Sequence, residues 1–227
     1  MTTDRLTIEV VLLDVDNTLL DFQAAQRTAL VLAFSEMGFS CESDRETRFD
    51  ALNKSYWRLF EQGKISRERL VVERFERFFE QEGLPGDAQT AERLYRKNLG
   101  KNHDLVPGAI DALRYLKSKY PVYLVTNGLK KTQEERLSDS GIDKLVDGVF
   151  ISEEVGYRKP QKEFFSYVFS HIPPIARDQA VVIGDSLSGD IEGGRAAGTR
   201  TVWYNPKGKV GTADLIIKDW KEIYDIL

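Results

Sequence analysis

The sequence predicts a doubly wound α/β fold with a helical insertion after its first strand. In the second half of the chain, apolar runs of strand length alternate with helical patterns, whereas residues 21–100 carry helical patterns alone. Alternating strands and helices are typical of a parallel sheet that is covered by helices on both faces. We therefore expect a mainly parallel, Rossmann-like core domain formed by residues 1–20 and 101–227, and an all-helical domain formed by residues 21–100.

The first strand is predicted at "IEVVLL", residues 8–13. A short continuous apolar run suits a strand that is buried on both faces of a parallel sheet. Two acids, Asp14 and Asp16, follow it directly, and Thr18 comes next. An isolated acid pair at a strand end is more often a turn or a helix cap than a reactive pair, because Asp accepts hydrogen bonds from free backbone amides. Taken alone, this segment leaves both interpretations open.

The insertion is predicted to be all helical. Four of its segments carry apolar residues at spacings of three and four, and each ends at a glycine, a frequent residue after the last helical turn. The four segments are "QAAQRTALVLAFSEMG", "RFDALNKSYWRLFEQG", "SRERLVVERFERFFEQEG" and "DAQTAERLYRKNLG".

Four further strands are predicted in the core, at "PVYLVT", "GVFIS", "AVVIG" and "RTVWY". Parallel strands place their carboxyl ends at one edge of the sheet, where ligands bind in folds of this class. Thr126 and Asn127 stand at the end of one strand, Asp185 stands at the end of another, and Asp190 follows five residues later. Together with the acids after the first strand, these side chains predict a polar, reactive site at this edge.

The acids at this edge predict a site for a divalent metal ion. Carboxylates that converge on one point repel one another unless they share a cation. The chain has only two histidines and one cysteine, too few for a metal site of those ligands, so oxygen atoms are left as the ligands. An all-oxygen site suits Mg²⁺. Lys159, directly before Pro160, supplies a positive charge that can neutralise a phosphate.

The amino-acid composition of the chain limits the kinds of partner that it can bind. The formal net charge of -4 argues against binding to nucleic acid or to an anionic membrane, so we expect a small-molecule partner. The single cysteine, Cys41, cannot form an internal disulfide, and no apolar run reaches the length of about 18 residues that a membrane span needs. We therefore expect a cytoplasmic protein. The sequence does not distinguish a monomer from a homodimer.

Four motifs follow one another along the chain: DxDxT at 14–18, TN at 126–127, KP at 159–160 and GDSxxxDI at 184–191. In this order, and at these strand ends, they resemble the motifs of the haloacid dehalogenase superfamily. The helical insertion is similar to the mobile cap of that superfamily, which identifies residues 21–100 as a cap. The segments "TNGLKKTQEERLSDSGI" and "ISEEVGYRKPQKEFF" are most similar to the bacterial pyrimidine 5'-nucleotidases that clear non-canonical nucleotides.

The resemblance implies that Asp14 attacks phosphorus and forms an aspartyl-phosphate, and that Asp16 serves as general acid and base. Dehalogenases of this fold lack an acid two residues after the nucleophile, because a halide leaves without a proton. Asp16 therefore favours phosphate esters over carbon–halogen bonds. Mutases with helical caps share similar motifs. In this cap, "NKSYW" and the "GKIS" turn that follows it resemble the nucleotidases, which favours hydrolysis.

The remaining motif residues are expected to bind the phosphoryl group and the metal. The phosphoryl oxygens would be held by Thr126, Asn127 and Lys159. The Mg²⁺ ligands would be Asp14, Asp185 and the backbone carbonyl of Asp16, with Asp190 and Thr18 behind them. Three residues are candidates for contact with the rest of the substrate: Phe22, Asn53 and Trp57.

We therefore expect an Mg²⁺-dependent phosphomonoester hydrolase, or phosphatase, for nucleoside 5'-monophosphates. Pyrimidine nucleotides such as UMP, dUMP and dTMP, with their non-canonical analogues, are the expected substrates. A sugar-phosphate or phosphoglycolate phosphatase of the same superfamily is the alternative. A phospho-accepting signalling domain also combines acids, Mg²⁺, threonine and lysine on a parallel sheet, but such receiver domains are shorter and have no helical insertion.

Overall fold

The computed structural model describes residues 7–227, which form two compact units. One unit comprises the described residues up to Phe22 together with His103–Leu227, and the other is Gln23–Asn102. The sequence predicts domain boundaries after residues 20 and 100. Residues 1–6 of the predicted core domain lie outside the described part of the chain.

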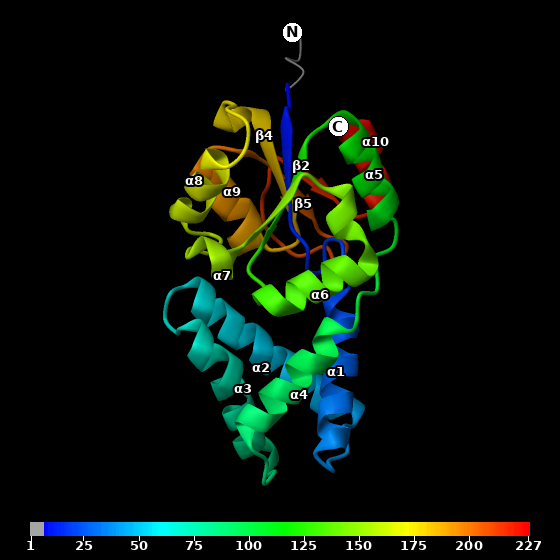
Figure 1. Ribbon diagram of the computed structural model, residues 1–227, viewed down its shortest axis with the longest axis vertical. Coiled ribbons are helices and arrows are strands. Elements are labelled where there is room, and N and C mark those ends of the chain that lie inside the picture. Colours follow the sequence, from blue (N-terminus) through cyan, green and yellow to red (C-terminus); the bar gives the residue numbers. More distant parts are fainter. Residues whose placement is uncertain (1–6) are drawn as a thin grey trace. The chain divides into compact units, whose positions relative to one another are not determined.

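The described residues of the core unit form a six-stranded parallel sheet with the strand order β3-β2-β1-β4-β5-β6 (Figure 1). The strands are β1 (Val10–Leu13), β2 (Val122–Thr126), β3 (Gly148–Ile151), β4 (Ala180–Gly184), β5 (Arg200–Tyr204) and β6 (Leu215–Ile217). The predicted doubly wound parallel sheet is confirmed. The sequence did not predict β6, because this edge strand has only three residues and two of them are exposed.

Helices of the core unit cover both faces of the sheet (Figure 1). They are α5 (Ala109–Lys119), α6 (Lys130–Ser140), α7 (Ser152–Val155), α8 (Lys162–Ser170), α9 (Gly193–Ala197) and α10 (Ile223–Ile226). Shorter turns of helix lie at Ile142–Leu145, Arg177–Gln179, Leu187–Glu192 and Trp220–Glu222. Within residues 7–227, no helix has both the length and the apolar character that a membrane span requires.

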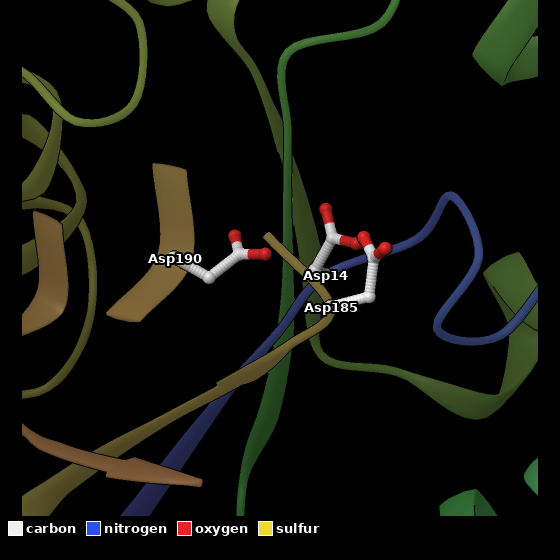
Figure 2. A group of neighbouring side chains, drawn as sticks. All are labelled: Asp14, Asp185 and Asp190. Atoms are coloured by element: carbon white, nitrogen blue, oxygen red, sulfur yellow. The ribbon is translucent and has the colours of Figure 1, made fainter. Parts of the chain in front are cut away.

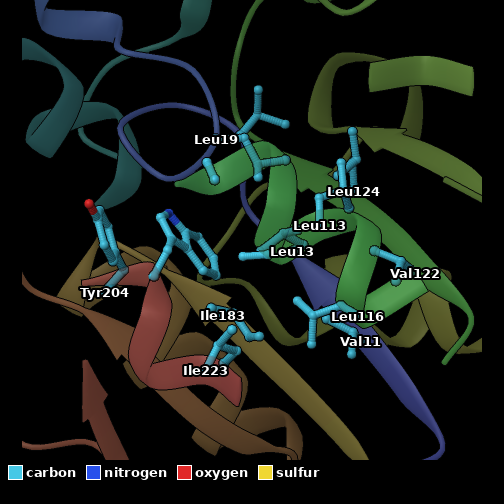
Figure 3. Packing of buried hydrophobic residues seen from close by; sticks show 14 of the residues in the cluster. Val11, Leu13, Leu19, Leu113, Leu116, Val122, Leu124, Ile183, Tyr204 and Ile223 are labelled. Atoms are coloured by element: carbon cyan, nitrogen blue, oxygen red, sulfur yellow. The ribbon is translucent and has the colours of Figure 1, made fainter. Parts of the chain in front are cut away.

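The apolar residues of β1 pack alternately on the two faces of the sheet. Val11 and Leu13 belong to the apolar cluster with α5 and α10, whereas Val10 and Leu12 belong to the cluster with α8 and α9. Successive side chains of a strand point to opposite faces, so a strand that is buried on both sides has a continuous apolar sequence. Figure 3 shows the first cluster, in which Leu113 of α5 lies near Leu13. This core fixes the strand ends that carry the candidate site.

The second unit is helical, as the sequence pattern indicates. Its helices are α1 (Phe22–Glu36), α2 (Ser43–Glu61), α3 (Arg67–Glu82) and α4 (Ala88–Gly100). Aromatic side chains fill its interior: Phe49 is stacked on Phe75 with 5.0 Å between ring centroids, and it meets Phe78 edge-on at 5.2 Å. α2 begins at Ser43, earlier than the predicted start at residue 48, because "SDRET" is polar and has no apolar periodicity.

Candidate active site

The turn after β1 separates the two acids that follow this strand. The N–H of Asp14 donates to a carbonyl of β4 (2.9 Å), which continues the sheet by one residue. The carbonyl of Val15 then accepts from the N–H of Leu20 (3.0 Å), and Asn17 adopts a left-handed φ of 62°. Asparagine tolerates this conformation better than most residues do. The chain reverses here, and Asp14 and Asp16 consequently have different neighbours.

Asp14 is buried and accepts two hydrogen bonds. Lys159 Nζ donates to its Oδ1 (2.7 Å), and Thr18 Oγ1 donates to its Oδ2 (2.8 Å). Burial raises the pKa of the Asp14 carboxyl well above its usual range, the charge of Asp190 raises it further, and the charge of Lys159 partly offsets both effects. Ionisation of Asp14 therefore depends on nearby positive charge.

Lys159 is buried, and all three of its ammonium hydrogens have acceptors. Its Nζ donates to Asp14 Oδ1, to Asp190 Oδ1 (2.6 Å) and to the carbonyl of Val125 (2.8 Å). Burial by itself lowers the pKa of Lys159, but the charges of Asp14 and Asp190 outweigh it and raise the pKa above its usual range. The Asn127 side chain is hydrogen-bonded to the backbone of Lys159, with Nδ2 to the carbonyl and Oδ1 to the N–H at 2.9 Å each. A phosphate oxygen would have to replace one of the three present acceptors of the ammonium.

Three carboxyl groups meet near the ends of β1 and β4. One oxygen each from Asp14, Asp185 and Asp190 lies within 4.8 Å of the others. Figure 2 shows the carboxyl groups of Asp14 and Asp185 close together, with that of Asp190 pointing toward them. Burial raises the pKa of Asp185 to about 7, and the charge of Asp190 adds to this effect. The set consists of carboxylate oxygens only, so it fits a hard divalent cation, which would offset the repulsion among the acids.

Both oxygens of Asp190 already accept hydrogen bonds, and its side chain has no exposed surface. Lys159 Nζ donates to Oδ1, and the N–H of Ser186 donates to Oδ2 (3.0 Å). A Cβ atom on Gly184 would lie 2.2 Å from Asp190 Oδ2, so glycine at the end of β4 permits this close approach. These contacts favour a role for Asp190 in orienting Lys159. Asp14 and Asp185 stand directly after β1 and β4 and are the candidate carboxylate ligands of a metal.

Asp185 has two neighbours that the sequence did not predict. Trp203 of β5 donates its indole N–H to the Asp185 carbonyl (3.0 Å), and Lys209 Nζ lies 3.7 Å from Asp185 Oδ2. The side chain of Asn205 holds the backbone of Lys209 through two hydrogen bonds of 2.8 and 2.9 Å. Trp203 lies in an apolar strand and Lys209 in a loop, so neither carries a local sequence signal for a site.

The carboxylate of Asp16 is bound by α6 and is not a member of the three-acid cluster. Gln133 Nε2 donates to its Oδ2 (2.5 Å), and Arg136 Nη1 donates to its Oδ1. The side chain of Asp16 is 24% exposed, whereas that of Arg136 is 0% exposed. The side chain of Asp16 is therefore engaged by α6, and its backbone carbonyl is the part of this residue that stays a candidate metal ligand.

Thr126, the last residue of β2, lies beside this group. Its Oγ1 accepts from the N–H of Gly128 (3.0 Å) and from Gln133 Nε2 (3.1 Å). A Cβ atom on Gly128 would lie 2.1 Å from Gln133 Nε2, so only glycine admits the glutamine here. Gln133 thus connects the carboxylate of Asp16 to the hydroxyl of Thr126.

Sequence reasoning missed both Gln133 and Arg136. The two residues stand three positions apart, and therefore lie on one face of α6. This helix follows β2 directly after the "TNG" turn, so its first turns begin at the edge of the sheet that carries the acids. The start of a helix at this edge is the signal that would have identified them.

The three candidate specificity residues have different surroundings. The ring of Phe22 lies 5.8 Å from the guanidinium of Arg136. Asn53 is buried inside the helical unit, where it accepts from Arg74 and donates to a glutamine of α1, so a substrate would have to compete with these bonds. Trp57 is half-buried, and its indole N–H has no hydrogen-bond partner within the described residues.

Comparison with known proteins gives a consistent result. The haloacid dehalogenase-like hydrolase family matches residues 8–198. YfnB of Bacillus subtilis (strain 168) is 40% identical over 95% of this chain and 94% of its own length. The crystal structure of YfnB bound to magnesium superposes with a TM-score of 0.93 at 39% identity, covering 96% of this chain and 98% of that one.

Two further relatives carry the name of an activity. The pyrimidine 5'-nucleotidase PynA of Streptococcus pneumoniae (strain ATCC BAA-255 / R6) is 36% identical over 86% of this chain and 83% of its own length. The pyrimidine 5'-nucleotidase YjjG of Escherichia coli (strain K12) is 30% identical over 85% of this chain and 84% of its own length.

Proposed function

The chain belongs to the haloacid dehalogenase-like hydrolase family and is a phosphatase, and from this premise we propose that it hydrolyses pyrimidine nucleoside 5'-monophosphates with the help of Mg²⁺. The observation that carries the proposed chemistry is the separation of Asp14 from Asp16. Asp14 is buried beside Lys159, whereas Asp16 is partly exposed and bound to α6. These surroundings suit a nucleophile and a proton carrier, respectively.

The reaction has two steps. In the first, an oxygen of Asp14 attacks phosphorus, the bond from phosphorus to the ester oxygen breaks, and Asp16 gives its proton to that oxygen. The nucleoside leaves as an alcohol, and Asp14 carries the phosphoryl group. In the second step, water attacks phosphorus and gives a proton to Asp16, while the bond from phosphorus to Asp14 breaks. Inorganic phosphate leaves, and both aspartates return to their first states.

Positive charge and hydrogen-bond donors around Asp14 stabilise the transferring group. Lys159 would turn one of its three donors from its present acceptors to a phosphoryl oxygen, and Gly128 would likewise turn its N–H from Thr126 Oγ1. Thr126 and the N–H of Asn127 would bind the remaining phosphoryl oxygens. A magnesium ion on Asp14, Asp185 and the Asp16 carbonyl would supply the charge that lets an anionic ester approach an anionic nucleophile. The magnesium in the related YfnB structure supports this choice of metal.

The preference for pyrimidine nucleotides rests on the relatives PynA and YjjG, whose names state that activity. Among the candidate specificity residues, Trp57 is the first to test, because its indole N–H lacks a partner among the described residues. If Trp57 binds the nucleoside, W57A will raise KM for dUMP and leave KM for p-nitrophenyl phosphate unchanged.

The test of the function is a phosphatase screen of nucleoside monophosphates, sugar phosphates and phosphoglycolate, with and without Mg²⁺. We expect pyrimidine monophosphates to give the highest kcat/KM, and we expect EDTA to abolish the activity. D14N should lower kcat at least about 1,000-fold, because it removes the nucleophile. Hydrolysis at the wild-type rate by D14N would disprove the nucleophile assignment. A sugar phosphate far better than every nucleotide would disprove the substrate class alone.

A further inference from the structure

Two residues of α6 hold the carboxylate of Asp16, one on each oxygen. Gln133 Nε2 donates to Oδ2 at 2.5 Å, and Arg136 Nη1 donates to Oδ1. Both side chains are buried, although Asp16 itself is partly exposed. Neither residue belongs to the four sequence motifs that carry the nucleophile, the phosphate-binding groups and the metal ligands.

We propose that Gln133 and Arg136 are positioning residues, which set the direction of the Asp16 carboxyl and thereby its transfer of a proton to the leaving oxygen. This inference rests on the proposed function, in which Asp16 is the general acid. A proton is transferred efficiently only when donor and acceptor are within hydrogen-bond reach and correctly oriented. A carboxylate oxygen has two lone pairs, so an oxygen that accepts one bond from α6 can still carry the proton.

The ion pair between Arg136 and Asp16 differs from a surface ion pair, because the side chain of Arg136 has no exposed area. A guanidinium with no exposed surface would be strongly destabilising without an anionic partner, and the carboxylate bound to Arg136 Nη1 is that of Asp16. The ring of Phe22 lies 5.8 Å from the same guanidinium and further limits its movement. Arg136 is consequently held in place from two sides, and a fixed guanidinium in turn fixes the Asp16 oxygen to which it is bound.

The Gln133 contact connects the proton donor to the phosphoryl site. The same Nε2 that binds Asp16 also lies 3.1 Å from Thr126 Oγ1, the hydroxyl proposed to bind a phosphoryl oxygen. Gly128 leaves the space that this glutamine occupies. One side chain therefore fixes the distance between the group that protonates the leaving oxygen and a group that holds the phosphoryl oxygens.

The inference can be tested through the leaving group. A nucleoside needs a proton to leave as an alcohol, whereas p-nitrophenolate leaves without one. The measurement is the ratio of kcat/KM for dUMP, or for the best alkyl phosphate of the screen, to kcat/KM for p-nitrophenyl phosphate, because kcat/KM reports the steps up to loss of the leaving group. D16N should lose about 100-fold more activity on the alkyl ester than on the phenyl ester.

The variants R136Q and Q133L should also lose more activity on the alkyl ester than on the phenyl ester. This bias toward loss on the alkyl ester should be about 10-fold, because Asp16 is still present in these variants but is misdirected. R136K keeps a cation at the buried position, so its bias should be smaller than that of R136Q. If the R136Q variant does not fold, R136K takes its place in the test. L137A is the matched control, since Leu137 is a buried residue of the same helix and has no contact with Asp16 among the described interactions. It should lower both kcat/KM values by the same factor.

The inference would be overturned if D16N showed a clear bias but kcat/KM fell equally on both esters in R136Q, R136K and Q133L. That result would leave the proposed function intact. Absence of a bias in D16N would instead remove the general acid from the proposed function, and the role of Gln133 and Arg136 with it. A bias in D16N that R136Q and Q133L share and L137A lacks would establish both.

Discussion

The side-chain amide of Asn127 and the backbone of Lys159 form a reciprocal pair of hydrogen bonds, each 2.9 Å long. Asn205 forms a second pair of the same kind with the backbone of Lys209, at 2.8 and 2.9 Å. Each asparagine fixes a lysine whose ammonium lies near an acid, at 2.7 Å in the first case and 3.7 Å in the second. Both polar atoms of the Asn127 side chain are thus engaged with the backbone of Lys159, so in the proposed function this side chain acts through Lys159.

Substitution of Asn127 should therefore act through Lys159. We expect N127A to lower kcat/KM about 10- to 100-fold, because a small displacement of a charged group at the reacting centre has an effect of this size. Inhibition by inorganic phosphate should weaken in the same variant. N205A removes the same kind of hydrogen bonds from Lys209 and should leave the inhibition constant for phosphate unchanged. Equal weakening of phosphate inhibition in the two variants would contradict this assignment.

Gly184 is expected to be intolerant of any side chain. A Cβ atom there would lie 2.2 Å from Asp190 Oδ2 and 2.8 Å from its Cβ, so the Asp190 side chain must shift, which we expect to disturb its hydrogen bond with Lys159. G184A should destabilise the protein by about 1–3 kcal/mol, the usual effect of overpacking a buried site. It should also lower kcat by nearly the same factor as D190A, since both variants take the Asp190 acceptor away from Lys159. Urea unfolding and steady-state kinetics measure the two effects, and wild-type kcat in G184A would show that Asp190 does not act through Lys159.

The metal site can be followed without measuring activity. Trp203 donates its indole N–H to the carbonyl of Asp185, so binding of Mg²⁺ to Asp185 should change the tryptophan fluorescence. D185N should weaken Mg²⁺ binding at least about 10-fold in a fluorescence or calorimetric titration, because it removes a charged ligand. W203F should abolish the fluorescence change while calorimetry still detects binding. Unaltered Mg²⁺ affinity in D185N would exclude Asp185 as a ligand.

The sequence predicted the strands and acids of the site because their signals are local. β1, β2 and β4 are apolar runs that end in Asp14, Thr126 and Asp185, and a parallel sheet brings such ends to one edge without further information. The three-acid cluster follows from this arrangement. Asp190 could be predicted near this edge because it lies in the short helical turn Leu187–Glu192 that directly follows β4.

Residues whose roles depend on tertiary contact could not be predicted in this way. Gln133 and Arg136 stand in the charged stretch "KKTQEERL", which is indistinguishable from a solvated helix face until the helix is placed beside Asp16. Lys209 reaches Asp185 from a loop after β5, and nothing in its own segment indicates that contact. The side chain of Asn127 resembles an ordinary turn residue, although its partner is Lys159, 32 positions away.

The stability of the helical unit should depend on pH through Glu82. A hydrogen bond from Arg48 lowers the pKa of Glu82 to about 2, with a further contribution from Arg45. An acid whose pKa is lowered in the folded state stabilises the protein above its unfolded pKa, here about 4.5, and this contribution is lost as the pH falls from there toward 2. The side chain of Glu82 is 7% exposed, but that of Arg48 is 54% exposed, so solvent weakens the pair.

We therefore expect E82Q to reduce the free energy of unfolding by about 1 kcal/mol between pH 5 and 7, and the difference from the wild type to shrink below pH 4.5. Comparing the two proteins cancels the titration of all other acids. E80Q is the matched control on the same helix, because Glu80 is 67% exposed and its pair with Arg77 should contribute nothing measurable. Urea unfolding at several pH values gives both differences, and a difference for E82Q that stays constant down to pH 2.5 would refute the ionic origin of this stabilisation.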